Sequence, residues 1–466
     1  MTKHVFFLGM GGIGMSALAR HLHSLGHVVG GYDAQPSPLL DALQDEGLWV
    51  TLQDDPEVLP PWARGAGPDT LTVVYTPAMP AHLSHLLHFK AQGHVPMKRA
   101  QLLGQLTSQK PTLAVAGTHG KTTTSNWLAA MLWEMPDRCH AFLGGIDHSH
   151  GTNHLTSQSA TWHVVEADEF DRSFHHLHPT HAAITTLDPD HLDVYGTSLA
   201  LEEAFAQFGQ QTREVLLLPM DLEWPHAKDG SGPKLERFAL CEAGQSLPTH
   251  ADHLAILHPE GATVEFHIGQ KEASGGLHFH ARPSMPGKHN AANALVAASL
   301  AHHAGASQEV IARVVSEFQG VHRRMDVHLD TPNAVYIDDY AHHPTELRAL
   351  IDAVKGRWPQ RHLTLVFQPH LYSRTRDFVQ EFSEVLALAD RVILLPIYPA
   401  REAPIPGVDA QWLFDNISSP DKHLVASDSI FTSLKACPVD VLVTAGAGDI
   451  DRLVPQALQH MQDRRK

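Results

Sequence analysis

The sequence predicts an α/β protein of three domains, with a Rossmann-like domain at each end and a larger α/β domain between them that carries extra antiparallel strands. Two observations predict this fold. Short apolar runs alternate with amphipathic helical stretches along most of the 466 residues. Two glycine-rich loops each follow an apolar run and precede a helical pattern. We place the domains at residues 1–107, 108–322 and 323–466.

The composition is that of a globular protein with excess negative charge. Hydrophobic residues make up 43% of the chain, which is enough to fill several cores. Lys and Arg number 34 against 51 Asp and Glu, so the formal net charge is −17. This balance argues against a nucleic-acid or anionic-membrane partner. It does not exclude phosphate ligands, because backbone N–H groups and a few placed cations bind those locally.

Cysteine usage and hydropathy predict a cytoplasmic protein without a membrane span. The three cysteines, Cys139, Cys241 and Cys437, lie far apart and form no C-x-x-C pair, which favours free thiols in a reducing compartment. No run of about 20 apolar residues is present, so no transmembrane helix is expected. The N-terminal stretch resembles a signal peptide, but its glycines fit a strand–loop–helix pattern better. The 37 histidines indicate a compositional habit, so a single histidine carries little functional weight.

Apolar runs and helical spacing define the elements of the first domain. The predicted strands are HVFFLGM (4–10), HVVGGYD (27–33) and LTVVYTPAM (71–79). The stretch MKRAQLLGQLTSQ (97–109) has the spacing of an amphipathic helix, and a Lys-Pro pair breaks the chain after it.

The other two domains continue the alternation. In the second, strands are expected at TLAVAG (112–117), WHVVEAD (162–168) and HAAITTLD (181–188), and a helix at GKHNAANALVAASLAHHAG (287–305). The turn-rich stretch from about 213 to 285, with ATVEFHI and GLHFHAR, predicts antiparallel strands. The strands expected in the third domain are AVYIDDY (334–340), HLTLVFQPH (362–370), DRVILLPIY (390–398) and VDVLVTAGAG (439–448).

The first glycine loop has the pattern of a dinucleotide site. Gly9, Gly11 and Gly14 fit G-x-G-x-x-G at the end of the first strand, and Asp33 ends the second strand. Considered alone, these residues favour NAD.

The second glycine loop, GTHGKTT (117–123), has the pattern of a nucleoside-triphosphate site. Backbone N–H groups of such a loop surround the β-phosphate, Lys121 reaches the β- and γ-phosphates, and the Thr122 hydroxyl faces Mg²⁺. We expect Lys121 to be exposed at the loop–helix junction. Val115 replaces the first glycine of the strict motif, so a glycine-rich turn with a chance Lys-Thr pair is the alternative.

Acidic residues gather where two predicted strands of the second domain end. The first strand end carries Glu166, Asp168, Glu169 and Asp171, and the second carries Asp190, His191 and Asp193. Because ligands bind at the carboxyl ends of parallel strands, carboxylates there suit Mg²⁺. The alternative for the acids is a solvated turn. Mg²⁺ rarely takes imidazole, and an isolated histidine such as His191 more often has a structural role.

Eight motifs in a fixed order make the pattern more specific than its parts. They are GTHGKTT, EADEFDRSF, DPDHLDVYG, HNAANA, GVHRRMD, DDYAHHPTE, FQPHLYSRTRDF and YPAREAPIPG. Together they closely resemble the Mur ligases of peptidoglycan synthesis, over essentially the whole chain. Within that family, the DDYAHHP and YPAREAPIPG motifs point to the member that joins L-alanine to UDP-N-acetylmuramate.

The resemblance implies that the first loop holds the pyrophosphate of UDP-N-acetylmuramate and not of NAD, since both ligands offer a diphosphate to a helix N-terminus. The residues that match this loop are Gly9, Gly11, Gly12, Gly14, Met15 and Ser16. Those that complete the sugar-nucleotide site by the same match are Asp33, Thr76, Pro77, Ala78 and Arg99.

The resemblance further implies ATP and Mg²⁺ as cofactors. The matching ATP-binding residues are Gly117, Thr118, His119, Gly120, Lys121, Thr122, Thr123, Asn290, Asn293 and Asp338, together with Arg323 or Arg324. Thr122 and Glu166 match ligands of a first Mg²⁺, and His191 matches a ligand of a second. The family's carbamylated lysine has no counterpart, since no Lys occurs between Lys121 and Gln210.

The segments that meet the incoming amino acid come from the last domain. The residues in these segments are Tyr340, His342, His370, Arg374 and Arg376, and we count Arg374 as catalytic with Lys121, Glu166 and His191. The usual QPHRYTRT motif has an arginine where this chain has Leu371, which leaves Arg374 or Arg376 to hold the acceptor carboxylate.

The implied reaction is ATP-driven amide formation through an acyl phosphate, carried out by a monomer or weak homodimer. Three alternatives stay open. The first is a ligase that recycles a tripeptide onto the same nucleotide sugar. The second, a nicotinamide oxidoreductase, leaves Lys121, Glu166 and His191 unexplained. The third is a non-catalytic ATP-binding regulator.

Overall fold

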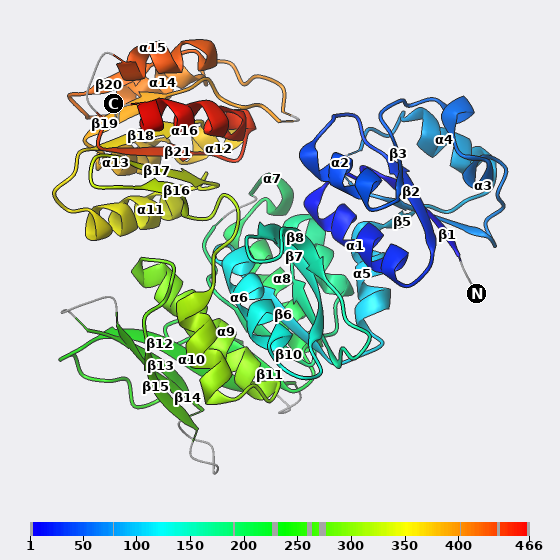
Figure 1. Cartoon of the computed structure of the whole chain (residues 1–466), viewed down its shortest axis with the longest axis horizontal. Coiled ribbons are helices and arrows are strands. Elements are labelled where there is room, and N and C mark those ends of the chain that lie inside the picture. Colours follow the sequence, from blue (N-terminus) through cyan, green and yellow to red (C-terminus); the bar gives the residue numbers. More distant parts are fainter. Residues whose placement is uncertain are drawn as a thin grey trace. The chain divides into compact units, whose positions relative to one another are not determined.

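The computed structural model describes residues 3–77, 79–189, 192–225, 232–258, 263–269, 276–400, 402–435 and 439–463. Three β-sheets, of five, ten and six strands, organise the chain (Figure 1). Two compact units contain them. The first unit comprises Met1–Arg282 with Ala292–Gln319, and the second comprises Pro283–Ala291 with Gly320–Lys466.

The first sheet is parallel throughout and has the strand order β3-β2-β1-β4-β5. Its strands are β1 (His4–Leu8), β2 (Val28–Tyr32), β3 (Trp49–Thr51), β4 (Leu71–Tyr75) and β5 (Met97–Lys98). Its helices are α1 (Ile13–Ser24), α2 (Pro38–Asp45), α3 (Pro61–Arg64), α4 (Ser84–Ala91) and α5 (Arg99–Thr107). The strand order reverses at β1, between β2 and β4, and this is the switch point where α/β sheets bind ligands.

The apolar run of β1 is continuous because both faces of the sheet are covered. Phe6 and Leu8 pack into a core on one face, and Val5 and Phe7 pack into a core on the other. This burial on both faces is typical of parallel sheets. It confirms the Rossmann-like fold predicted for the start of the chain.

The second sheet has the order β15-β14-β13-β12-β11-β10-β6-β9-β7-β8. At its centre, β6 (Thr112–Ala116) pairs in parallel with β9 (Trp162–Glu166) and β10 (His181–Ile184). At one edge, β7 (Cys139–Asp147) and β8 (Thr152–Leu155) pair antiparallel. The helices that accompany this sheet are α6 (Lys121–Trp133), α7 (Leu192–Tyr195), α8 (Ser198–Gln211), α9 (Lys288–His303) and α10 (Gln308–Glu317).

The other arm of this sheet corrects the antiparallel pairing predicted for residues 213–285. The strands β11 (Val215–Pro219), β12 (Lys234–Glu242) and β13 (His253–Leu257) pair in parallel. Among the described residues of this arm, only β14 (Val264–Ile268) and β15 (Leu277–Ala281) add antiparallel strands. Alternating apolar and polar residues indicate a sheet with one solvent face, and they do not fix strand direction. The connections that precede β12 and β13 are longer than a hairpin turn, so each strand can run parallel to the one before it.

The third sheet belongs to the second unit and has the order β16-β17-β21-β18-β19-β20. Only the edge strand β16 (Asp326–Asp330) is antiparallel to its neighbour β17 (Val335–Asp339). The remaining strands are β18 (Leu363–Phe367), β19 (Arg391–Leu394), β20 (Lys422–Leu424) and β21 (Val441–Ala445). The helices are α11 (Pro344–Arg357), α12 (Tyr372–Asp377), α13 (Val379–Leu386), α14 (Ala410–Asn416), α15 (Ile430–Lys435) and α16 (Val454–Asp463).

The predictions about membrane spans, cysteines and domain boundaries have different outcomes. Among the described residues, no helix is long and apolar enough to cross a membrane. Cys139 and Cys241 are free thiols, and Cys437 lies outside the described residues. The domain boundaries predicted after residues 107 and 322 stay predictions.

Candidate active site

The first glycine loop turns tightly between β1 and α1. Gly9 has a φ of +89°, and a Cβ on it would lie 2.6 Å from Thr76 Cγ2. The Gly11 N–H donates a hydrogen bond of 2.8 Å to Asp33 Oδ2, so this carboxylate holds the loop. The role of Asp33 toward a sugar nucleotide stays a prediction.

The loop ends at the N-terminus of α1, whose first N–H groups favour an anion. Gly12 is the N-cap residue and has no side chain to cap the helix. Met15 and Ser16 are buried in the first turn. The Ser16 hydroxyl donates to the Gly12 and Ile13 carbonyl oxygens and accepts from Asn153 Nδ2 at 2.9 Å, so it holds the helix start in place.

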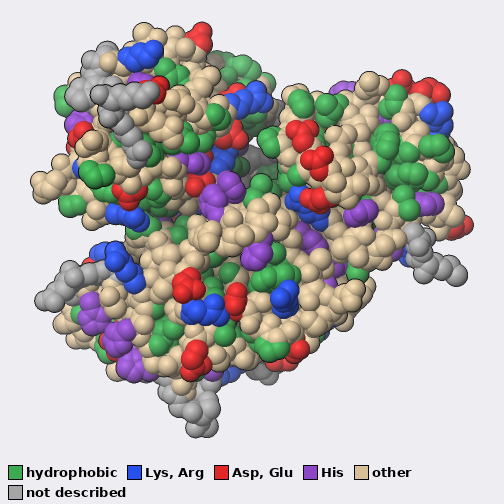
Figure 2. Space-filling model, viewed as in Figure 1, with side chains coloured by type: hydrophobic (Ala, Val, Ile, Leu, Met, Phe, Trp, Pro, Cys, Tyr) green, Lys and Arg blue, Asp and Glu red, His purple; other side chains and the backbone are tan. Residues whose placement is uncertain are grey.

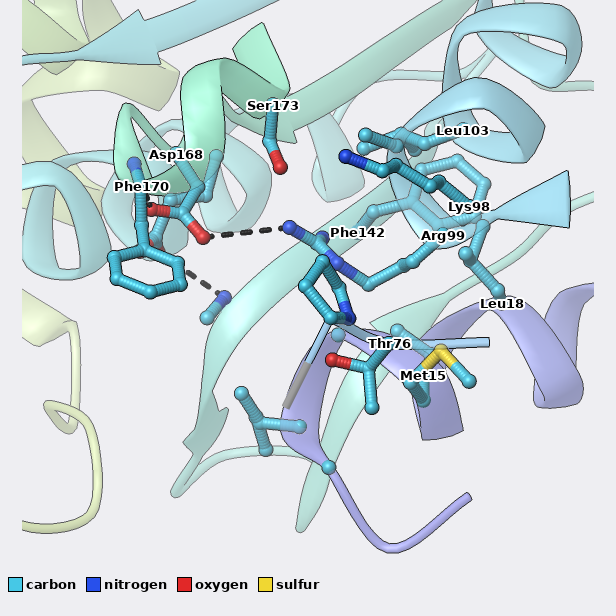
Figure 3. A pocket seen from close by; sticks show the side chains of 18 of the residues that line it. Met15, Leu18, Thr76, Lys98, Arg99, Leu103, Phe142, Asp168, Phe170 and Ser173 are labelled. Carbon is cyan, nitrogen blue, oxygen red and sulfur yellow. Dashed lines mark hydrogen bonds and ion pairs between the residues drawn. The ribbon is translucent and has the colours of Figure 1, made fainter. Parts of the chain in front are cut away.

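A cavity of about 300 Å³ adjoins this loop within the first unit (Figure 3). Residues of the first sheet's loops and helices line one side, and residues of β7, β9 and the segment after β9 line the other. The lining includes Met15, Thr76, Pro77, Lys98, Arg99, Phe142, Glu166 and Asp168. The cavity therefore joins the predicted sugar-nucleotide residues to the acidic strand end of the second sheet.

Two adjacent cations at the start of α5 face the acids. Arg99 Nη2 lies 3.3 Å from Asp168 Oδ2, the ion pair drawn in Figure 3. Lys98 Nζ lies 2.8 Å from Asp171 Oδ2, and this hydrogen bond raises the pKa of Lys98. The sequence prediction included Arg99 and missed Lys98. The position of Lys98 beside Arg99, at the start of a predicted helix, is the sequence signal that could have identified it as a site residue.

The segment after β9 is strained where it meets these cations. Asp171 and Arg172 both have a φ of +54°. Two consecutive non-glycine residues in the left-handed region cost free energy, of order 1–3 kcal/mol each, and such strain is typical of functional sites. The ion pair of Lys98 with Asp171 helps to hold this conformation.

The second glycine loop lies against the segment that follows β10. Gly117 has a φ of +131°, and a Cβ on it would lie 2.1 Å from Thr185 Oγ1. The Thr118 N–H donates to the Thr186 carbonyl oxygen at 3.1 Å. A Cβ on Gly120 would lie 2.4 Å from Asn293 Oδ1, so α9 also contacts this loop. The glycines at both positions are required by close approach.

Lys121 is held inside the loop, which corrects the prediction that it is exposed. Its side chain is 13% exposed, and Nζ lies 2.9 Å from both carboxylate oxygens of Glu169. It also donates to the Gly117 and Thr118 carbonyl oxygens. Burial lowers the pKa of Lys121, but the surrounding carboxylates, with Glu169 foremost, raise it overall. The ammonium is therefore charged at the point where the loop would surround a phosphate.

Thr122 and Glu166, which the resemblance assigns to one Mg²⁺, lie within hydrogen-bond distance of each other. Thr122 Oγ1 donates to Glu166 Oε1 at 3.1 Å, and the Gly144 N–H donates to Glu166 Oε2 at 3.1 Å. A hydroxyl and a carboxylate oxygen are hard donors that fit Mg²⁺. Glu166 also lines the cavity beside the first glycine loop, so one carboxylate borders both predicted nucleotide sites.

The other residues predicted around the second glycine loop have different outcomes. His119 Nε2 lies 3.4 Å from Asp188 Oδ2, and Thr123 is buried in α6. Ala78 and the proposed second metal ligand His191 lie outside the described residues. Glu169 was predicted as one acid of a cluster, and its pairing with Lys121 was not predicted because tertiary packing creates it.

In the second unit, Arg323 binds the carboxylate predicted to meet the ATP ribose. Arg323 has a φ of +61°, and its Nε lies 3.3 Å from Asp338 Oδ2. Asp338 is 1% exposed, and burial raises its pKa to about 6. The guanidinium groups of Arg323 and Arg324 both lie 5.0 Å from the Tyr340 ring, so the choice between them stays open.

Four of the five predicted acceptor residues form one cluster. The ring of His342 lies 5.2 Å from that of Tyr340 and 5.8 Å from that of His370, and Arg374 Nη1 lies 3.3 Å from His370 Nδ1. Arg376 instead pairs with its neighbour Asp377 and is 52% exposed.

Three further residues of this unit complete the comparison with the sequence prediction. Leu371, which replaces the usual arginine, is buried with a φ of +71°. Tyr398 stacks on His370 at 5.8 Å, a contact that the sequence analysis missed although Tyr398 opens the YPAREAPIPG motif. Asn290 is buried in α9, and its side chain donates to the Pro286 carbonyl oxygen at 2.8 Å.

Two glycine loops that each follow a parallel strand, a partly buried lysine and a hydroxyl–carboxylate pair define a nucleotide-binding α/β enzyme. Three family models match the chain in sequence order. They are the Mur ligase family catalytic domain over residues 4–111, the Mur ligase middle domain over 115–301, and the Mur ligase glutamate ligase domain over 323–450. The chain belongs to the Mur ligase family.

Individual proteins of this family are similar to the chain over nearly its full length. The UDP-N-acetylmuramate–L-alanine ligase of Porphyromonas gingivalis is 42% identical, with 99% of each chain covered. That of Flavobacterium johnsoniae is 40% identical over 97% of this chain and 96% of its own. Among solved structures, the UDP-N-acetylmuramate–alanine ligase of Thermotoga maritima has a TM-score of 0.79 at 24% identity, with both chains fully covered. The murein peptide ligase of Psychrobacter arcticus has a TM-score of 0.69 at 23% identity, with 98% of each chain covered.

Proposed function

We propose that this protein joins L-alanine to the carboxylate of UDP-N-acetylmuramate, with ATP cleaved to ADP and phosphate, as a step of peptidoglycan precursor synthesis. The observation that carries the proposal is the position of Glu166. It lines the cavity beside the first glycine loop and hydrogen-bonds Thr122 of the second loop. A sugar-nucleotide carboxylate and the γ-phosphate of ATP would meet beside this residue. The relatives about 40% identical over nearly the full chain support the choice of substrates.

The reaction has two chemical steps. A carboxylate oxygen of the muramate attacks the γ-phosphorus of ATP. The bond between the γ-phosphorus and the oxygen that bridges it to the β-phosphate breaks, so ADP departs and an acyl phosphate is formed. The amino group of L-alanine then attacks the acyl carbon, loses a proton, and displaces phosphate. Phosphoryl transfer of this kind depends on positioning and charge neutralisation more than on covalent help from the protein.

The chain's own groups supply the charge and the position. Lys121 presents a fixed cation within the loop that would hold the β- and γ-phosphates. Mg²⁺, held by the Thr122 hydroxyl and Glu166, would neutralise the phosphate oxygens, with His191 the proposed ligand of a second ion. The N-terminus of α1 and the cations Lys98 and Arg99 would bind the diphosphate and acidic groups of the sugar nucleotide.

The cluster around His370 is the proposed acceptor region. Arg374 is 6% exposed beside His370, which suits a fixed partner for the carboxylate of L-alanine. With Leu371 in place of the family's arginine, Arg374 would carry this contact alone, because Arg376 pairs with Asp377. We propose further that the enzyme works in the cytoplasm as a monomer or weak homodimer.

Phosphate release tests the proposal directly. Purified protein with ATP, Mg²⁺ and UDP-N-acetylmuramate should release phosphate when L-alanine is added. L-serine and glycine, tested in competition, measure strictness for the acceptor. Turnover with a tripeptide and none with L-alanine would replace the proposal by a recycling ligase. Binding of NAD without binding of UDP-N-acetylmuramate would overturn it, and ATP binding without turnover would indicate a regulator.

A further inference from the structure

A carboxylate surrounded by histidines lies on the partly exposed face of the strands β14 and β15. Glu265 is on β14, His267 follows it on the same strand, and His278 and His280 are on β15. His258 follows β13. Figure 2 shows histidine side chains gathered over the region that Figure 1 labels β12 to β15.

Strand register brings these side chains to one face. On β14, Phe266 is buried while Glu265 and His267 are partly exposed, and β15 repeats this alternation around Phe279. Glu265 pairs with His280 and His267 pairs with His278 across the ladder. The His-x-His spacing on β15 places both of its histidines on the solvent side because side chains alternate along a strand.

All four histidines direct Nε2 at the one carboxylate. His267 and His278 each place Nε2 at 2.9 Å from Glu265 Oε1. His258 and His280 place Nε2 at 3.3 and 3.8 Å from Oε2. The rings of His267 and His278 stack with centroids 4.3 Å apart, which fixes both nitrogens in one direction. In each half of the cluster, the two nitrogens and the carboxylate oxygen lie within 4.8 Å of one another.

We propose that this cluster holds one divalent transition-metal ion of the zinc class, bound by Glu265 together with His267 and His278. Imidazole nitrogen and carboxylate oxygen are the ligands that Zn²⁺ takes in proteins, commonly in sets of three or four. A neutral imidazole ring offers the lone pair of one ring nitrogen to a metal ion. The ion would connect β15 to β14, the two strands at one edge of the ten-stranded sheet.

A second cluster in the same unit shows why this one is preferred. Glu236 accepts hydrogen bonds of 2.8 Å from His253 Nε2 and from His303 Nε2. The Gly269 N–H donates to His253 Nδ1, so the ring proton is on Nε2 and that nitrogen has no lone pair for a metal. Lys234 Nζ, 2.7 Å from Glu236 Oε1, also occupies the carboxylate. This buried cluster is a hydrogen-bond network of the fold.

Metal titration of the full chain without a histidine tag tests the site. Calorimetry with Zn²⁺ at neutral pH, in excess Mg²⁺ so that oxygen-ligand sites are filled, should show one ion bound at micromolar affinity or tighter. Co²⁺ bound to the same groups should give visible absorption bands. The double variant His267→Ala/His278→Ala and the single variant Glu265→Gln should each weaken binding by about 10- to 100-fold or more.

The matched control is His423→Ala. His423 Nε2 lies 2.9 Å from Asp421 Oδ1, so it is an exposed histidine–carboxylate pair without further histidines on that carboxylate among the described residues. This variant should keep the affinity of the parent. All variants change exposed or partly exposed side chains, and thermal melts without metal should match. No binding at micromolar Zn²⁺, or equal affinity in the double variant, would overturn the proposal. Phosphate release by the ligase reaction is scored separately and does not bear on this result.

Discussion

Thr122 Oγ1 donates a hydrogen bond of 3.1 Å to Glu166 Oε1, which joins the first turn of α6 to the carboxyl end of β9. These residues are 44 positions apart in the chain. Their contact exists because β6 and β9 are neighbouring parallel strands, whose carboxyl ends lie at the same edge of the sheet. The first prediction concerns this pair.

Glu166→Ala should weaken the dependence of turnover on Mg²⁺ more than it weakens binding of UDP-N-acetylmuramate. The lost carboxylate is a hard ligand beside Thr122, whereas the diphosphate is expected at the α1 N-terminus. We expect kcat to fall by about 10²-fold or more. Initial rates over a Mg²⁺ titration, with sugar-nucleotide affinity from calorimetry, measure both. Glu166→Gln keeps the shape of the side chain and serves as the control for packing. A collapse of sugar-nucleotide affinity with an unchanged Mg²⁺ titration would mean that the two sites are wrongly assigned.

Lys121→Ala should remove turnover and should also destabilise the protein. Lys121 and Glu169 form an ion pair with side chains 13% and 1% exposed, so removing the ammonium takes a close counter-charge away from a buried carboxylate. The cost of such a loss is about 3–5 kcal/mol. The double variant Lys121→Met/Glu169→Gln removes both charges and should regain much of the stability while staying inactive. Chemical denaturation and phosphate release separate the two effects. Turnover within about threefold of the parent in either variant would contradict the role of Lys121.

Gly12→Val should raise the KM for UDP-N-acetylmuramate strongly and that for ATP little. The Gly12 backbone is extended with a φ of −66°, and a Cβ there would meet its nearest neighbour, the Gly9 carbonyl oxygen, at 3.5 Å. The fold therefore accepts a side chain that would block a diphosphate from the helix start. Gly11→Val is a poorer test, because its Cβ would lie 2.9 Å from Asp33 Oδ2 and disturb the loop itself. An unchanged KM for the sugar nucleotide would place that ligand elsewhere.

Asp338 should make the second unit less stable as pH rises from about 4 to about 6. Burial raises the pKa of this carboxyl to about 6 from its ordinary value of 3.8, against the attraction of Arg323. Between these values the folded chain keeps a proton that the unfolded chain has lost, so unfolding becomes easier with increasing pH. Asp338→Asn does not titrate. The difference in unfolding free energy between parent and variant should therefore shift against the parent over this range. Denaturation of both proteins at several pH values measures it, and parallel curves would show an ordinary pKa.

Local chemistry explains which features the sequence predicted. The glycines of both loops are visible because Gly9, Gly117 and Gly120 have positive φ angles and close neighbours that only glycine accepts. The strands β1 and β6 are visible because parallel strands buried on both faces are continuously apolar.

Packing between distant segments explains what the sequence did not show. Two ion pairs were not predicted, that of Lys98 with Asp171 and that of Lys121 with Glu169. Both form only when the sheets bring these distant segments together. The parallel direction of β11 to β13 was missed for a similar reason, because alternation reports a solvent face and not a direction.

The position of the Glu166 carboxylate depends on the lack of a side chain at Gly144. The Gly144 N–H binds Glu166 Oε2, and a Cβ at this position would lie 2.2 Å from the same oxygen. A methyl group there would displace the carboxylate of Glu166 from its present position, although no acid, base or nucleophile of the chain had been replaced. A survey of variants that scores only acids, bases and nucleophiles would pass Gly144→Ala as harmless, although the carboxylate proposed to hold Mg²⁺ would have moved.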